Sequence, residues 1–181
     1  MIAQQRQDYG YTTYVDLHAA FDSLSRSSLW LLMTRPGIPD KIVRLINALY
    51  SNSVICVRSS QSESTWFTIE SEVRRGCVLA PDSFATGVDW LVERTVCSAT
   101  NGVSFGPHSF SDLDFADDVT LLDELLELLV PVLKTMATGA ASLGLEVNSQ
   151  KTKVEALGSR EDKPSTITAQ GQEVAVVEKF V

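Results

Sequence analysis

Hydrophobic positions recur at helical spacing in several parts of this chain, and two such segments are clear from the pattern alone. Residues 40–50 predict an amphipathic helix, because apolar side chains recur every three or four positions on one face: Ile42, Val43, Leu45, Ile46 and Leu49. Pro81 and Asp82 mark the start of a second helix, whose buried stripe comprises Phe84, Val88, Leu91 and Val92.

A third helix is predicted over residues 125–143, where Leu and Val recur along one face. Gly144 follows it as a C-cap glycine would, and Pro131 should kink it or lie in its first turn. Nearer the start of the chain, residues 19–32 also have a helical pattern. That segment ends at a break over residues 35–39, which contains two prolines and a glycine.

Strand-like segments lie between and after these helices. Residues 11–17 are rich in Thr, Tyr and Val and predict a strand that ends at Asp16. Residues 54–58 and 65–69 predict a hairpin with a polar loop. Further strands are expected at residues 145–147, 151–156 and 174–181. The predicted class is therefore α+β, with a small antiparallel sheet and helices packed on one face.

The most informative polar positions are two adjacent acids, Asp117 and Asp118, between short apolar stretches. This pattern predicts a tight β-hairpin with the acids at its tip. No Lys or Arg occurs between Arg94 and Lys134. The same window holds other acids, of which four are expected to form a solvated rim: Asp112, Asp114, Asp123 and Glu124. Crowded carboxylates repel one another, and Mg²⁺ commonly supplies the missing positive charge.

A third acid strengthens this interpretation, since Asp117 and Asp118 alone would be read as a solvated turn. Asp16 stands at the end of the first predicted strand. If that strand neighbours the hairpin, the three carboxylates meet around one point. Such a group can hold two Mg²⁺ ions about 3.5–4 Å apart, which clamp the attacking and leaving oxygens of a phosphoryl transfer.

Composition adds limits rather than a function. The chain has 181 residues, enough for one domain with a real core. Its formal net charge of -8 argues at first sight against nucleic-acid binding, although much of the acidity surrounds the candidate metal site. The longest apolar runs are too short to span a bilayer, and no signal-peptide pattern opens the chain. Cys56, Cys77 and Cys97 suit neither a disulfide framework nor a zinc site, so a reducing, intracellular compartment is expected.

Four blocks of this sequence, in order, resemble the palm of a reverse transcriptase from a non-LTR (LINE-type) retrotransposon. The resemblance spans residues 11–181 and implies a polymerase palm-like sheet with part of the fingers. It implies a single domain over residues 1–181, with most of the fingers upstream and the thumb downstream absent. The blocks are Val15–Leu17 with Ala20–Asp22, Arg75–Pro81 with Phe84, Phe115–Asp118, and Gly144–Asn148 with Lys151–Lys153.

The resemblance also implies an activity and its partners. The expected reaction is RNA-directed DNA synthesis, a nucleotidyl transfer to a primer 3′-hydroxyl that uses two Mg²⁺ ions, for which Mn²⁺ can substitute. The expected partners are an RNA template, a DNA primer, dNTPs and the rest of a retrotransposon polyprotein, including its fingers, thumb and an endonuclease. A ribonucleoprotein in the cytoplasm or nucleus is the expected location, and no membrane partner is expected.

Individual roles follow from the same resemblance. Asp16, Asp117 and Asp118 would be the catalytic metal ligands, helped by the backbone carbonyl of Leu17. Phe21 would lie under the sugar and exclude ribonucleotides. Three further residues are assigned to substrate: Arg75 and Gly76 in the nucleotide and template pocket, and Lys151 near the phosphates. Arg75 stands where this family usually has Gln, which leaves the hydrogen bonding near the template open.

Other interpretations remain open at this stage. A decayed or domesticated scaffold would suit the acidic net charge, Arg75 and Pro131, but a scaffold has no need of three repelling carboxylates. An RNA-dependent RNA polymerase palm is disfavoured by Phe21. The RNA polymerases that share this palm have a second Asp at the position that Phe21 occupies here. Phe21 would otherwise be a core residue, and Lys151 would lie on an exposed strand.

Overall fold

The computed structural model of the chain describes residues 10–35, 37–69, 77–99, 102–105, 107–116, 118–157, 164–169 and 171–180. Its centre is a six-stranded sheet in the order β11-β12-β10-β1-β8-β7. The strands are β1 (Gly10–Val15), β7 (Asp112–Phe115), β8 (Asp118–Asp123), β10 (Lys153–Leu157), β11 (Thr166–Ala169) and β12 (Gln172–Val177). Neighbouring strands run antiparallel except β10 and β12, which are parallel, so the predicted antiparallel sheet is mixed at this one pair.

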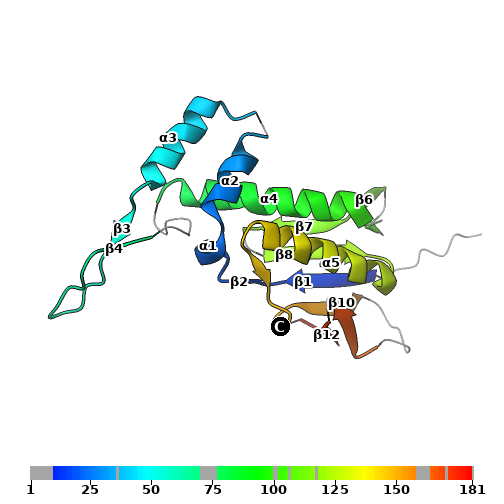
Figure 1. Cartoon of the computed structure of the whole chain (residues 1–181). Helices are drawn as coiled ribbons and strands as arrows, with labels where there is room; N and C mark the ends of the chain where they lie inside the picture. Colours follow the sequence, from blue (N-terminus) through cyan, green and yellow to red (C-terminus); the bar gives the residue numbers. More distant parts are fainter. Residues whose placement is uncertain are drawn as a thin grey trace, which may run out of the picture.

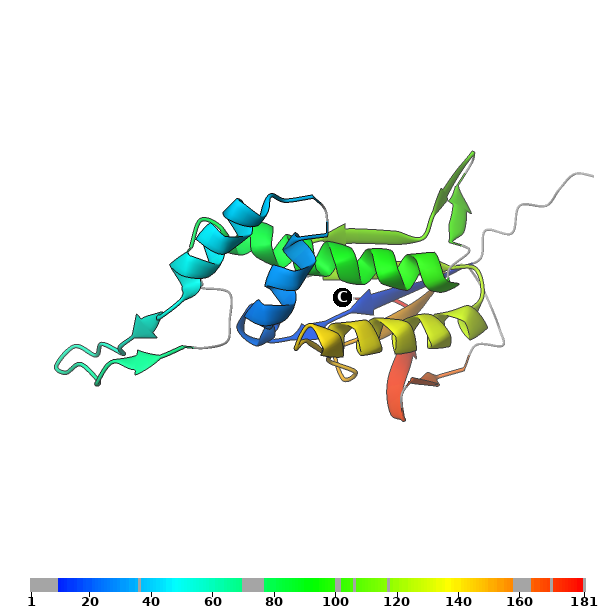
Figure 2. The same cartoon turned by 45° about the horizontal axis from the view of Figure 1, so that its top comes forward.

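Two long helices cover one face of this sheet, as predicted. Helix α4 (Ala80–Ala99) and helix α5 (Leu126–Ser142) lie side by side over it (Figures 1 and 2). The predicted stripe of α4 is buried, and so are the facing side chains of α5 and the sheet. The largest fully buried side chains include Phe84, Leu91, Leu121, Leu129, Met136 and Val154. This apolar layer fixes the sheet against the helices, and it leaves the opposite face of the central strands available for a site.

The helix predicted over residues 19–32 is two helices instead, α1 (Ala20–Ser23) and α2 (Arg26–Met33). Ser25 separates them, because it acts as the N-cap of α2 and its side chain accepts a hydrogen bond from the Ser28 amide. The amide of Ser25 in turn donates to the carbonyl of Leu143 at 2.7 Å. This tertiary hydrogen bond takes the donor that a continuous helix would have used.

The C-terminal helix follows its prediction more closely. Gly144 has a φ of +80° just after α5, which confirms the predicted C-cap. Pro131 lies inside α5 and past its first turn, which leaves the kink as the remaining prediction for this proline, and α5 continues to Ser142.

Several short strands were not predicted from the sequence. They are β2 (Leu17–His18), and β5 (Val103–Phe105) paired with β6 (His108–Phe110). β2 pairs with β9 (Glu146–Val147), which confirms the strand expected at residues 145–147. β11 (Thr166–Ala169) was not predicted either. Strands of two to four residues are too short for hydrophobic alternation to reveal them.

A hairpin arm projects from the body of the molecule beyond helix α3 (Asp40–Tyr50) (Figures 1 and 2). It consists of β3 (Val54–Ile55), β4 (Phe67–Thr68) and their connection, so the predicted hairpin is confirmed with shorter strands. An ion pair between Arg58 and Glu63 joins its two sides near the tip, at 2.6 Å. The helix predicted over residues 40–50 is also confirmed, although much of its apolar face is exposed, as Leu45 and Leu49 show.

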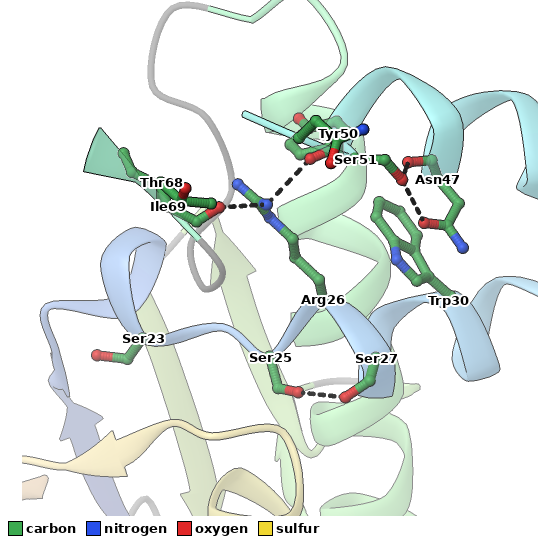
Figure 3. A pocket seen from close by; sticks show the side chains of 11 residues that line it. Ser23, Ser25, Arg26, Ser27, Trp30, Asn47, Tyr50, Ser51, Thr68 and Ile69 are labelled. Carbon is green, nitrogen blue, oxygen red and sulfur yellow. Dashed lines mark hydrogen bonds between the residues drawn. The ribbon is translucent and has the colours of Figure 1, made fainter. Parts of the chain in front are cut away.

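Arg26 connects this arm to the rest of the molecule. Its Nη1 donates hydrogen bonds to the carbonyls of Tyr50 at the end of α3 (3.1 Å) and Ile69 just after β4 (3.0 Å) (Figure 3). The guanidinium also lies 5.1 Å from the centre of the Tyr50 ring, whose edge meets Trp30. Arg26, Trp30, Tyr50 and Ile69 line a cavity of about 580 Å³ at the base of the arm. One side chain of α2 therefore holds both ends of the arm.

Replacing Arg26 by Leu should loosen the arm and destabilise the protein by about 2 kcal/mol, because two carbonyls lose a charged donor. Urea unfolding measures the loss. Hydrogen exchange at the Ile69 amide, which donates to the Ser53 carbonyl, reports the local opening. Arg44→Leu, at an exposed position of α3, is the matched control. Equal effects of the two substitutions would show that Arg26 does not hold the arm in place.

Candidate active site

The predicted acidic hairpin is present. Phe115 pairs with Asp118 across β7 and β8, so only Ala116 and Asp117 separate the two strands. Ala116 has a φ of +58°, as the first position of the primed turns that join such strands requires. Asp118 is exposed beside this turn, and Asp117 lies outside the described residues.

Asp16 lies next to this hairpin, which confirms that the first strand is its neighbour. β1 and β8 are antiparallel, and Val15 pairs with Val119 at the end of the register. The following residue, Asp16, therefore comes at the same end of the sheet as Asp118. Both acids line one cavity of about 620 Å³, which also includes Leu17 and Lys151. Residues far apart in the sequence are thus brought together by the pairing of the two central strands.

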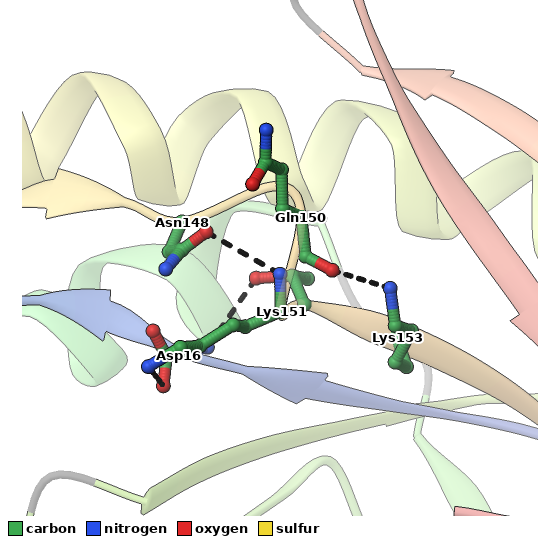
Figure 4. A network of polar contacts seen from close by, with 6 residues as sticks. Asp16, Asn148, Gln150, Lys151 and Lys153 are labelled. Carbon is green, nitrogen blue, oxygen red and sulfur yellow. Dashed lines mark hydrogen bonds and ion pairs between the residues drawn. The ribbon is translucent and has the colours of Figure 1, made fainter.

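The backbone of Asp16 is held on both sides by the segment between β9 and β10. The Asp16 amide donates to Oγ1 of Thr152 at 3.3 Å (Figure 4). The Asp16 carbonyl accepts from the Asn148 amide at 2.8 Å. Thr152 is fully buried. Sequence reasoning did not assign this threonine a role, and a lone Thr between two lysines gives no signal that would have done so. It positions Asp16 through the main chain.

Lys151 brings positive charge to these acids. Its Nζ lies 3.8 Å from Oδ1 of Asp16, and the Lys151 side chain is 69% exposed (Figure 4). The Lys151 amide donates to Oδ1 of Asn148, and Nζ of Lys153 donates to the carbonyl of Gln150. The acid-rich window of the sequence contains no Lys or Arg, but the fold brings Lys151 to the acids from a later part of the chain. Because the pair is exposed, it adds little to stability and leaves both groups available to a ligand.

Two aromatic residues that the sequence did not single out form another part of the cavity wall. The rings of Tyr14 and Phe180 stack with centres 4.3 Å apart and planes at 15°. The Tyr14 hydroxyl donates to Glu155 Oε2 at 2.9 Å. Burial, then this hydrogen bond and the negative charge of Glu155, raise the pKa of the Tyr14 hydroxyl. Tyr14 lies two residues before Asp16 on β1, which was its only sequence signal.

Comparison with known proteins identifies the family. The model of a protein family described as "Reverse transcriptase (RNA-dependent DNA polymerase)" matches residues 1–174. The chain belongs to the reverse transcriptase family. Its relatives include Pol polyproteins of the type-1 retrotransposable element R2. The one from Popillia japonica is 29% identical over 149 residues, and the one from Nasonia vitripennis is 29% identical over 141. These matches confirm the predicted resemblance to LINE-type elements.

The matched regions cover 82% and 78% of this chain, but only 21% and 14% of those polyproteins. The chain therefore spans a small fraction of the length of these curated relatives.

Solved structures agree on the fold. Apo telomerase from Candida tropicalis, truncated from the C-terminal domain, superposes with a TM-score of 0.60 at 13% identity, covering 95% of this chain and 35% of that one. Telomerase from Candida albicans, in complex with a TWJ fragment of telomeric RNA, gives 0.61 at 13% identity, covering 92% and 29%. The predicted α+β, palm-like fold is confirmed.

The remaining predicted site residues of this chain lie in different places. Leu17 lines the cavity, and its side chain is buried. Phe21 is half-buried on α1, and its ring stacks on Phe84 of α4. Arg75 and Gly76 lie outside the described residues, so the roles assigned to them stay predictions.

One acid departs from its prediction. Asp112, Asp114, Asp123 and Glu124 were expected to form a solvated rim, but Asp123 is fully buried. Side chains alternate along a strand, so Asp123 points to the same side of β8 as Val119 and Leu121, toward the core. Its Oδ1 accepts from the Leu125 amide at the start of α5, at 3.1 Å. Asp123 therefore supports that helix.

The carboxylates suit a divalent cation. Reverse transcriptases use divalent metal ions. Asp16 and Asp118 offer hard oxygen ligands on one cavity, the donor type that Mg²⁺ prefers. Among residues whose placement is described, no group of three or more His, Cys, Asp or Glu side chains is arranged to hold a metal, and Asp117 is not among them. None of the described helices is both long and apolar enough to cross a membrane.

Proposed function

We propose that this chain is the catalytic core of an RNA-directed DNA polymerase, which adds deoxynucleotides to a primer 3′-hydroxyl on an RNA template. The observation that carries the proposal is the meeting of Asp16 and Asp118 at one end of two paired central strands, on a shared cavity. Membership of the reverse transcriptase family supports it. The partners would be a primer–template duplex and the rest of a polyprotein. Together they would form a ribonucleoprotein in the reducing environment of the cytoplasm or nucleus.

Asp16, Asp117 and Asp118, with the carbonyl of Leu17, would hold two Mg²⁺ ions, and Mn²⁺ would substitute. Such ions lower the pKa of the attacking hydroxyl and neutralise the departing pyrophosphate. Thr152 and Asn148 keep the main chain of Asp16 in position through the two hydrogen bonds described above.

The other proposed roles concern the nucleotide. The ammonium of Lys151, already beside Asp16, would face the phosphates of the incoming nucleotide as a donor and counter-charge. Arg75 and Gly76 would line the nucleotide and template pocket. Phe21 would meet the sugar and clash with a 2′-hydroxyl, which selects deoxynucleotides.

Primer extension on an RNA template tests this function directly. With Mg²⁺, the chain should extend the primer with dNTPs and not with NTPs, and EDTA should stop the reaction. Phe21→Ala should lower the preference for dNTPs by roughly 10- to 100-fold, because the obstacle to the 2′-hydroxyl is removed. If the folded chain bound primer–template but showed no metal-dependent synthesis, it would be a non-catalytic nucleic-acid-binding scaffold instead.

A further inference from the structure

Phe21 lies on an element that has little rigidity of its own. Helix α1 has four residues, and its N-cap residue, Ala19, has a left-handed φ of +44°. So short a helix gains little from its own hydrogen bonds, and tertiary contacts must hold it. The ring of Phe21 is half-buried and packs against the core. Its orientation therefore depends on what lies beside it.

The ring of Phe84 lies against it. The two ring centres are 4.1 Å apart and the planes are inclined by only 18°, a stacked pair. Phe84 is 1% exposed and belongs to α4, a helix of twenty residues that packs along both α5 and α2. One ring is thus fixed by the rigid core, and the other is carried by a short helix that ends in extended backbone at Leu24.

We infer that Phe84 is a positioning residue for sugar selection, because its ring holds Phe21 where a 2′-hydroxyl would clash. The inference rests on the proposed role of Phe21 in the polymerase. Phe84 is too buried to touch a nucleotide itself. If its ring is shortened, the space left behind lies directly behind Phe21, and the Phe21 ring can retreat into it. The obstacle to the 2′-hydroxyl then weakens although every residue facing the nucleotide is unchanged.

A purely structural Phe84 would behave differently from a positioning one. Loss of core packing lowers stability and reduces incorporation of dNTPs and NTPs by the same factor. A displaced Phe21 changes the ratio between them. The ratio of kcat/KM for dNTPs to that for NTPs therefore separates the two roles.

The test compares Phe84→Leu with Leu91→Val in single-nucleotide addition by the full chain. Leu91 is a fully buried residue about two turns further along α4, so its shortening controls for general loss of core packing. Phe84→Leu should lower the preference for dNTPs about tenfold, whereas Leu91→Val should leave it unchanged. Adding Phe84→Leu to Phe21→Ala should cause no further loss of preference, since contacting residues are coupled.

Two outcomes would overturn the inference. One is an unchanged preference in Phe84→Leu when Phe21→Ala loses it. The other is measured by NMR and does not depend on enzymatic activity. Nuclear Overhauser contacts between the Phe21 ring and core side chains other than residue 84 report where the ring lies, and Phe84→Leu should change them while Leu91→Val does not. Unchanged Phe21 contacts in Phe84→Leu would show that Phe84 does not position Phe21. A wild-type chain that incorporates no dNTP would count against the proposed function, and the NMR comparison would still decide the role of Phe84.

Discussion

Asp16→Asn should reduce primer extension by roughly a thousandfold or more, about 4 kcal/mol of lost transition-state stabilisation. The amide keeps the size of the side chain but removes the negative charge that would bind metal. The fold should tolerate it, since the ion pair with Lys151 is solvent-exposed and the main-chain bonds to Thr152 and Asn148 do not involve the carboxylate. Asp117→Ala should have an effect of the same size.

Asp114→Asn is the matched control for this prediction. Asp114 is an exposed acid on β7 of the same hairpin, but it does not line the cavity that contains Asp16 and Asp118. It should retain nearly full activity. Extension rates, Mn²⁺ titrations and urea unfolding of the variants would be measured together. Wild-type rates in Asp16→Asn would sink the assignment of this acid as a catalytic ligand.

Gly144→Ala should cost about 3 kcal/mol of stability, of which roughly 1–2 kcal/mol comes from a left-handed backbone with a side chain. The rest comes from crowding, because an added Cβ would lie 2.7 Å from the carbonyl oxygen of Ser23. The turn itself is well defined. The Gly144 amide donates to Ala141 and the Leu145 amide to Ala140, the two bonds of a Schellman motif.

Gly171→Ala separates these two contributions. Gly171 has a φ of +76°, but nothing lies within 4 Å of the position that an added Cβ would take. The Gly171→Ala variant should therefore lose only the stability that a left-handed backbone with a side chain costs, about 1–2 kcal/mol. Urea unfolding of the two variants measures the difference. Equal losses would show that Ser23 moves aside freely and that the contact between α5 and α1 is weak.

The contact at Gly144 also links two blocks of the sequence. The carbonyl of Leu143 accepts from the Ser25 amide, so the end of α5 is fastened to the junction of α1 and α2. Asp16 and Phe21 lie just before this junction. A loosened Gly144 should therefore disturb the proposed nucleotide site as well as overall stability.

Local patterns were sufficient for several elements. The buried stripe of α4, the extent of α5 with its C-cap at Gly144 and the acidic hairpin all follow from neighbours within a few residues. Periodicity and turn chemistry act at that range, so the sequence carries them openly. The alternation of side chains along β8 also predicts that Asp123 is buried with Val119 and Leu121, although its charge suggested an exposed position.

The sequence by itself thus determined the family resemblance, the main helices and the identity of the candidate acids. Only the tertiary structure decided that residues 19–32 break at Ser25, that Lys151 lies beside Asp16, and that Phe84 lies against Phe21. Each of these contacts joins segments far apart in the chain. Their geometry depends on strand order and helix packing, which no local pattern encodes.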